Sequence, residues 1–137
     1  MNRFDLQELA DLRVREAELL LNASLYDGAY YLAGYAVECA LKACIAKQTK
    51  EFDFPDRTLV NRSYTHKLSD LIGVAGLQAE LEGKMASDRE FSTNWETVRD
   101  WSQESRYERH EESKAKDFYQ AITDERNGVL TWLRVHW

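Results

Sequence analysis

Apolar residues recur at intervals of three and four along most of the chain, and this spacing constrains the fold more than any other feature. It is the pattern of helices that bury one face against a core. The 137 residues include one proline and six glycines, and no Asn-Gly or Asp-Gly pair joins two alternating apolar runs, so hairpins are not indicated. The sequence therefore predicts an all-α protein.

The predicted helices follow from this periodicity and from the residues that interrupt it. The second of them carries few charges and is apolar on nearly every side, so we expect it to lie at the centre of the fold. Residues 50–65 form a long connection, residues 102–117 a solvated turn region, and no repeat or linker divides the chain, which predicts one domain over residues 1–137. The helices are expected at about Asp5–Ala23, Gly28–Gln48, Leu77–Met85, Phe91–Trp101 and Phe118–Trp137, with a short helix from Leu68, capped by Thr65, that ends near Gly73 or Gly76.

Charge and composition exclude several classes of protein. Twenty-four acidic residues against eighteen Lys and Arg leave a net charge of −6, which argues against broad wrapping of duplex nucleic acid but leaves room for a small basic site. No apolar run approaches the roughly 18 residues of a membrane span, and the first residues lack the pattern of an export signal. Cys39 and Cys44 lie on one predicted helix and point away from each other, so they cannot form a disulfide together. We expect a cytoplasmic protein without a membrane partner.

No metal or cofactor motif is present in the sequence. None of His66, His110 and His136 lies within one helical turn of another His or Cys, and the His-Glu-x-x-His motif is absent. The chain also lacks the ordered glycines of phosphate-binding loops and the Gly-x-Ser-x-Gly of a nucleophile elbow. We therefore expect neither a bound metal nor a cofactor.

Arg106 and His110 are the first candidate for chemistry. Four residues apart, they would share one face if the segment were helical. An imidazole that transfers a proton and a guanidinium that binds phosphate suit metal-free cleavage of a phosphodiester. The alternative is that both are solvated or paired with neighbouring glutamates. Arg62 and His66 repeat the spacing, but there a structural His66 beside a capping Thr65 is favoured.

Glu38 and Lys42 are the second candidate. They have the order and spacing of an ion pair inside the most apolar helix, with Tyr31, Gly34 and Tyr35 on the same side. A buried carboxylate needs a partner, so this pair is either structural or part of a ligand site. The four tryptophans fit a hydrophobic core better than a base-stacking surface.

Three blocks of sequence carry a resemblance to a known family. They are residues 27–43 (DGAYYLAGYAVECALKA), 64–71 (YTHKLSDL) and 95–107 (WETVRDWSQESRY). In this order they resemble a HEPN domain, over nearly the whole chain. The resemblance implies an up-and-down bundle of four to five helices, usually a homodimer. It also implies a prokaryotic toxin–antitoxin or phage-defence system, with a nucleotidyltransferase or antitoxin as partner.

The resemblance also implies two kinds of activity. Catalytic HEPN domains are metal-independent endoribonucleases in which an Arg and a His, separated by four to six residues, meet across the dimer. Here Arg106 and His110 come nearest, with three residues between them. Ser105-Arg106-Tyr107 resembles instead the branch of the family that lacks the nuclease pair and binds nucleotides or partner proteins.

Three functions are therefore predicted as alternatives. The first is a dimeric, non-catalytic module that binds RNA, a nucleotide or a partner protein. The second is an endoribonuclease toxin that uses Arg106 and His110, and the third is a plain protein-interaction module. The residues expected to bind the ligand of the first are Arg99, Arg106, Tyr107, Arg109, Glu38 and Lys42.

Overall fold

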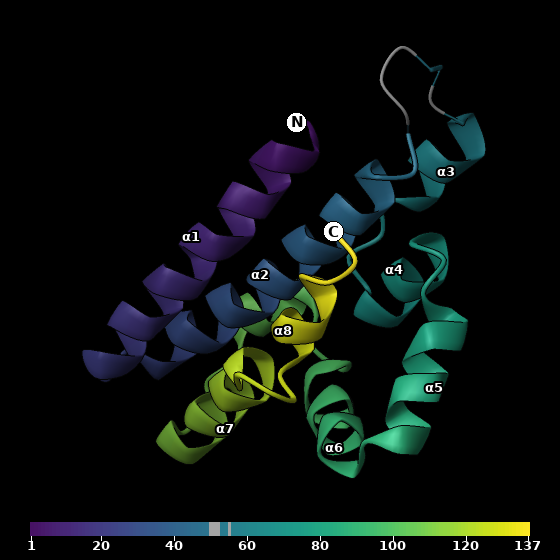
Figure 1. Ribbon diagram of the computed structural model, residues 1–137. Helices are drawn as coiled ribbons and strands as arrows, with labels where there is room; N and C mark the ends of the chain where they lie inside the picture. Colours follow the sequence, from purple (N-terminus) through teal and green to yellow (C-terminus); the bar gives the residue numbers. More distant parts are fainter. Residues whose placement is uncertain (50–52, 55) are drawn as a thin grey trace.

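The computed structural model describes residues 1–49, 53–54 and 56–137, and every regular element in these ranges is a helix (Figure 1). The all-α prediction is confirmed. Among the described residues, five helices have ten or more residues, in agreement with the expected four to five. The elements are α1 (Arg3–Asn22), α2 (Tyr26–Ala46), α3 (Arg57–Arg62), α4 (Leu68–Val74), α5 (Gln78–Ser87), α6 (Arg89–Val98), the 3-10 helix η1 (Gln103–Tyr107), α7 (Glu112–Thr123) and α8 (Val129–Leu133).

Helices α1 and α2 form an antiparallel hairpin, and α1 lies along one edge of the molecule (Figure 1). A reciprocal capping box between Asn2 and Asp5 opens α1. Ala10 and Ala17 are fully buried, so the two helices approach closely. Ser24 makes the turn with a φ of 62°. Leu25 is the N-cap of α2, and no side chain caps the start of this helix.

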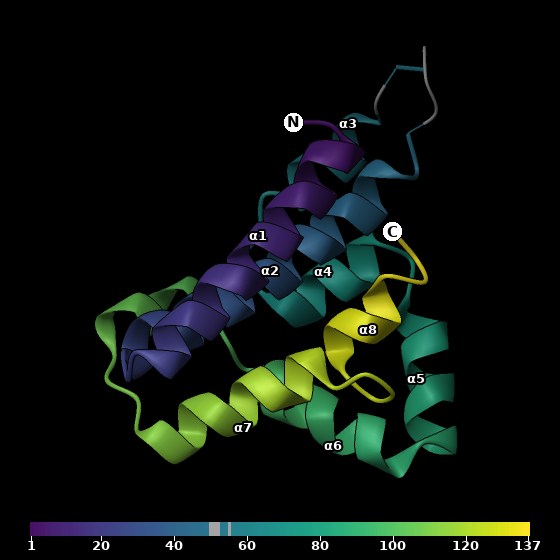
Figure 2. The same cartoon turned by 60° about the vertical axis from the view of Figure 1, so that its left-hand side comes forward.

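Helix α2 is the centre of the fold, as its composition predicted. It packs against α1, α4, α7, α8 and η1, and thirteen of its residues are buried. Figure 2 shows α1, α2 and α4 on one side of the molecule and α6 and α7 on another. The large side chains that fill the space around α2 include Phe91, Phe118 and Ile122, which are almost completely buried. The core is therefore a single cluster around one apolar helix.

The C-terminal part of the chain differs from the prediction of one last helix. Helix α7 ends at Thr123 and α8 starts at Val129. Between them the Asp124 carboxylate accepts hydrogen bonds from the backbone amides of Arg126 and Asn127. A Cβ atom at Gly128 would lie 2.5 Å from the carbonyl oxygen of Asp124, so only glycine fits this junction. Local hydrogen bonding of the Asp124 side chain thus competes with helix continuation.

Three smaller expectations also need correction. The connection 50–65 contains helix α3, capped by Asp56, although residues 50–52 and 55 lie outside the described part. Lys67, not Thr65, is the N-cap of α4, and the Thr65 hydroxyl accepts a hydrogen bond from the Lys67 amide before the helix begins. Segment 102–117 includes η1 and the first turns of α7, and Ser105 within it is buried. Among the described residues, no helix is long and apolar enough to cross a bilayer.

Candidate functional site

A buried carboxylate on α2 is the centre of the candidate site. The side chain of Glu38 is 3% exposed, and its Oε1 accepts a hydrogen bond of 2.9 Å from Nζ of Lys42. The predicted ion pair is therefore present. Lys42 is 25% exposed, so the pair lies at the boundary between core and solvent. A carboxylate at such depth needs hydrogen-bonding partners, and one lysine satisfies only one of its oxygens.

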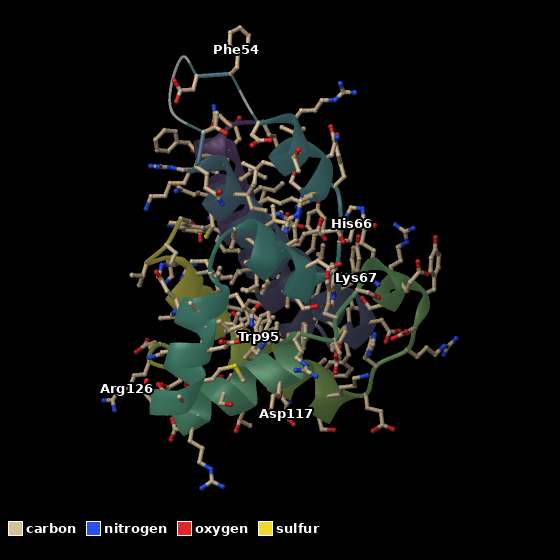
Figure 3. The ribbon with its side chains drawn as sticks, turned by 90° about the vertical axis from the view of Figure 1, so that its right-hand side faces the viewer. Phe54, His66, Lys67, Trp95, Asp117 and Arg126 are labelled. Atoms are coloured by element: carbon tan, nitrogen blue, oxygen red, sulfur yellow. The ribbon has the colours of Figure 1, made fainter. Side chains whose placement is uncertain are left out.

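His66, on the connection between α3 and α4, is the second partner of this carboxylate. Its Nδ1 lies 2.9 Å from Glu38 Oε1 and 3.1 Å from Nε2 of Gln103 on η1. A neutral ring nitrogen either donates or accepts one hydrogen bond, and next to the Glu38 carboxylate Nδ1 carries the proton and donates it. The Gln103 amide nitrogen, a donor itself, is then a neighbour of Nδ1 and not its hydrogen-bond partner, and among the described residues Nε2 of the ring makes no hydrogen bond. The side chain is 47% exposed, and Figure 3 shows His66 on the side of the molecule where η1 lies. Glu38 thus holds an oriented imidazole at the surface.

Sequence reasoning did not find the contact between His66 and Glu38. His66 was expected to be structural beside a helix start, whereas the structure joins it to a residue 28 positions earlier. The only signal was the block YTHKLSDL, in which His66 precedes α4. No local spacing relates this histidine to α2, because the two segments meet only when α4 packs against α2.

Trp101 forms the inner boundary of the site. It is 2% exposed and packs face-on against Gly34, where a Cβ atom would lie 2.2 Å from the indole ring. Glycine at position 34 is what allows the indole to reach the α2 backbone. The indole Nε1 of Trp101 and Oε2 of Glu38 are both buried without a hydrogen-bond partner among the described residues. Buried polar atoms of this kind are rare and often mark functional sites.

Aromatic side chains of α2 line the site on the side towards α1. The rings of Tyr31 and Tyr35 lie 6.1 Å apart, and Tyr31 is 5.9 Å from Trp101. Arg13 of α1 lies over the Tyr35 ring at 6.0 Å. Burial raises the pKa of Tyr35, and Cys39 and Glu38 raise it further, so its hydroxyl stays protonated and able to donate. Burial also raises the pKa of the Cys39 thiol to about 12, which makes it chemically inert.

Arg106 brings a permanent positive charge next to the aromatic side of the site. It projects from η1 and is exposed, with its guanidinium 4.8 Å from the centre of the Tyr107 ring. The hydroxyl of Tyr107, and to a smaller extent that of Tyr31, raise the pKa of Arg106. The Tyr31 contact ties Arg106 to the aromatic side of the site. Tyr107 itself is 74% exposed.

The structure does not bring all the predicted ligand residues together. Arg99 is the C-cap of α6 and lies 3.8 Å from Asp100, while Arg109 is exposed beyond the end of η1. In the described part of the chain, no hydrogen bond or ion pair connects either arginine to Glu38, Lys42 or His66. The polar site that the structure assembles therefore consists of Glu38, Lys42 and His66, with Gln103 beside His66. Tyr31, Tyr35 and Trp101 form its aromatic side, and Arg106 and Tyr107 of η1 adjoin that side through the contact of Arg106 with Tyr31.

His110 has a different environment from Arg106. Its side chain is fully buried and stacks on Tyr30 at 3.8 Å, and its backbone amide donates to Asp27. Because η1 ends at Tyr107, the two side chains do not share a helical face. The geometry gives His110 a packing role between η1 and α7. The nuclease role of Arg106 and His110 stays a prediction.

The comparison with known families agrees with this architecture. The HEPN domain model matches residues 5–135, nearly the whole chain. The chain belongs to the HEPN domain family. No curated protein and no solved structure matches it significantly. Membership supports a nucleotide- or RNA-related role for this HEPN domain in general terms. The homodimer, the toxin–antitoxin or defence context and the nucleotidyltransferase or antitoxin partner stay predictions.

Proposed function

We propose that this HEPN domain binds a nucleotide at the site around Glu38, His66 and Arg106. The observation that carries the proposal is convergence: α2, the α3–α4 connection and η1 each place a polar side chain at one location, where Lys42 and His66 both bind Glu38 and Nε2 of Gln103 lies 3.1 Å from Nδ1 of His66. Long-range contacts of this kind hold side chains in fixed positions, which is what a binding site needs. A structural ion pair alone would not require the half-exposed His66 or the exposed Arg106.

The chemistry of these side chains matches the parts of a nucleotide. Arg106 offers a planar fork of donors to a phosphate group. The free Nε2 of His66 can hydrogen-bond with a phosphate or a ribose hydroxyl, because Glu38 fixes the orientation of its ring. The exposed ring of Tyr107 offers a face on which a base can stack.

The charge balance around η1 favours a small ligand over a long RNA. Between residues 99 and 109 three arginines are balanced by three acids, Asp100, Glu104 and Glu108, and the whole chain carries a charge of −6. Binding along an extended phosphate backbone depends on a surplus of cations. A nucleotide needs only one or two of them, and Arg106 supplies one beside aromatic rings.

Arg106→Ala is the variant that tests the proposal. Nucleoside triphosphates and monophosphates, inorganic phosphate and a short single-stranded RNA are titrated into the wild-type protein by calorimetry. A charge-assisted hydrogen bond contributes about 1.5–3 kcal/mol, so we expect nucleotide affinity to fall by roughly tenfold or more. Arg126→Ala is the matched control, because Arg126 is also exposed and lies on the α7–α8 turn, well away from His66 (Figure 3).

Three results would contradict the proposal. They are no binding of any nucleotide at millimolar concentration, an equal loss of affinity in both arginine variants, and binding of the RNA but of no free nucleotide. The last result would move the function to RNA recognition. The same RNA sample, checked for cleavage on a gel, tests the nuclease alternative.

A further inference from the structure

The imidazole of His66 is held on one edge and free on the other. Its Nδ1 lies 2.9 Å from Oε1 of Glu38, and Nε2 makes no hydrogen bond among the described residues. Because Nδ1 faces a buried carboxylate and the side chain is half-exposed, the edge of the ring that carries Nε2 is the part that solvent reaches. His66 can therefore take up a proton at Nε2 without losing its contact with Glu38.

The groups of α2 and η1 next to His66 carry no net charge. Nζ of Lys42 lies 2.9 Å from the same oxygen of Glu38 that His66 contacts, so the ammonium and the carboxylate compensate each other. On η1 the nearest group is the uncharged amide of Gln103, 3.1 Å from Nδ1. The other carboxylate oxygen of Glu38, Oε2, is buried and has no partner in the described part of the chain, so Glu38 still favours a positive charge beside it.

The groups from α4 and from the chain next to His66 also balance. Asp70 on α4 accepts a hydrogen bond of 3.5 Å from the hydroxyl of Thr65, the residue before His66. Lys67 is the residue after it and is exposed, and Figure 3 shows Lys67 and His66 on the same side of the molecule. With a neutral imidazole, the surroundings of His66 thus hold no surplus positive charge for an anion.

The charge of the ligand decides what His66 must supply. A phosphate monoester carries a charge of nearly −2 at neutral pH, because its second proton dissociates at about pH 6, whereas a phosphodiester carries one negative charge. Arg106, whose charge is permanent, compensates one of them. Histidine is the side chain that ordinarily gains a positive charge between pH 5 and 8. A second cation for a phosphate monoester can therefore come from His66.

We propose that His66 binds the terminal phosphate of a nucleotide as an imidazolium and thereby selects phosphate monoesters over diesters. This inference rests on the proposed nucleotide site. In the complex Nδ1 donates to Glu38 and Nε2 donates to a phosphate oxygen, so the ring lies between two anionic acceptors. The proton on Nε2 comes from solvent when the nucleotide binds and returns to solvent when it leaves.

The affinity for a nucleoside monophosphate should consequently fall as the pH rises above neutrality. The imidazolium is lost at high pH, and a charge-assisted hydrogen bond is about twice as strong as a neutral one. We expect the affinity to fall about fivefold to tenfold between pH 6.5 and pH 8.5. Titration of the ligand itself does not explain a fall in this direction, because the phosphate becomes more negative as the pH rises.

Calorimetric titrations at pH 7.5, in buffers of different ionisation enthalpy, count the protons that are taken up on binding. The probes are the nucleoside 5′-monophosphates and their phosphate methyl esters, which are monoanions. The wild type should take up about half a proton with a monophosphate and almost none with its methyl ester. It should also bind the monophosphate about tenfold more tightly than the ester.

His66→Gln is the variant that assigns the proton. Glutamine keeps an amide donor for Glu38, so the variant should still bind monophosphates, but without proton uptake and with only about a twofold preference over the esters. His136→Gln is the matched control, because Nδ1 of His136 also contacts a carboxylate, that of Glu80 at 3.2 Å, outside the site. This control should behave as the wild type does.

The outcomes separate this inference from the proposed function. If no nucleotide binds, both fail. If monophosphates bind without proton uptake, or no more tightly than their methyl esters, the role of His66 is wrong and the nucleotide site stands. Proton uptake that persists in His66→Gln, or that His136→Gln abolishes, assigns the proton to another group and also overturns the inference.

The wild type gives a readout that does not depend on how the variant folds. In NMR spectra at pH 7.5, the resonance of the Cε1 proton of His66 should move towards the imidazolium position when a monophosphate is added, and should not move with the methyl ester. An unchanged resonance at saturating monophosphate overturns the inference.

Discussion

Gly34→Ala is the substitution whose effect the structure defines most sharply. Gly34 lies in the buried middle of α2, and an added Cβ atom would be 2.2 Å from both Cδ1 and Nε1 of Trp101 and 2.4 Å from Cε2. These distances are far below normal contact, and the indole is only 2% exposed, so it cannot move out into solvent without other side chains moving. Either the ring or the α2 backbone must shift.

The sign of the effect follows from two opposing terms. Alanine in a helix interior is more stable than glycine by about 0.5–1 kcal/mol. Overpacking a filled core costs about 1–3 kcal/mol, and full loss of the packing of a tryptophan costs about 3–5 kcal/mol. We expect the indole to be displaced in part, which gives a net destabilisation of about 1–3 kcal/mol.

Urea unfolding followed by circular dichroism measures this difference. The matched control is Gly83→Ala on α5, where nothing lies within 4 Å of an added Cβ atom. That variant should stabilise the protein by about 0.5–1 kcal/mol. In a Trp101→Ala background, Gly34→Ala should lose its penalty and become neutral or stabilising. If Gly34→Ala is as stable as the wild type, or remains equally damaging without the indole, the argument from close packing is wrong.

Two further predictions concern charged groups. Glu38→Gln keeps the size of the side chain but removes the charge that Lys42 and His66 bind. The free energy of unfolding in urea should therefore fall by about 1–3 kcal/mol. An unchanged unfolding midpoint would contradict the role of Glu38 in the network. Asp88 caps α6, and the hydrogen bond from the Phe91 amide lowers the pKa of Asp88 below its ordinary 3.8. The stabilisation by Asp88 is therefore present above pH 3.8 and is lost as the pH falls further. Asp88→Ala should lower the melting temperature at pH 7, and the melting temperature of the variant should decline less than that of the wild type between pH 4 and pH 2. Parallel curves of melting temperature against pH for the two proteins would refute this.

The helical class and the central position of α2 could be predicted from the sequence because both depend on local patterns. Periodicity and composition indicate which face of a helix is apolar. A helix without a polar face must be buried on all sides by other helices. The pair of Glu38 and Lys42 is likewise local, since one turn of helix brings positions i and i+4 together.

The sequence predicted the start of α4 at Leu68, but the residue that caps α4 and the break between α7 and α8 were missed, again for a local reason. Both depend on which backbone amides donate a hydrogen bond to a nearby side-chain oxygen. The Asp124 carboxylate accepts hydrogen bonds from the backbone amides of Arg126 and Asn127. The Thr65 hydroxyl accepts one from the backbone amide of Lys67. The free energies of such a hydrogen bond and of a continued helix differ by only about 1 kcal/mol. The spacing of hydrophobic residues does not indicate which of the two is favoured.

By itself, then, the chain determines its helices, its central apolar element and one ion pair, since each involves neighbours within a few residues. Only the tertiary structure decides that His66 turns to Glu38, that Trp101 closes on Gly34, and that His110 is buried while Arg106 is exposed. These contacts join residues far apart in the chain. They depend on how whole helices pack, and no local spacing carries that information.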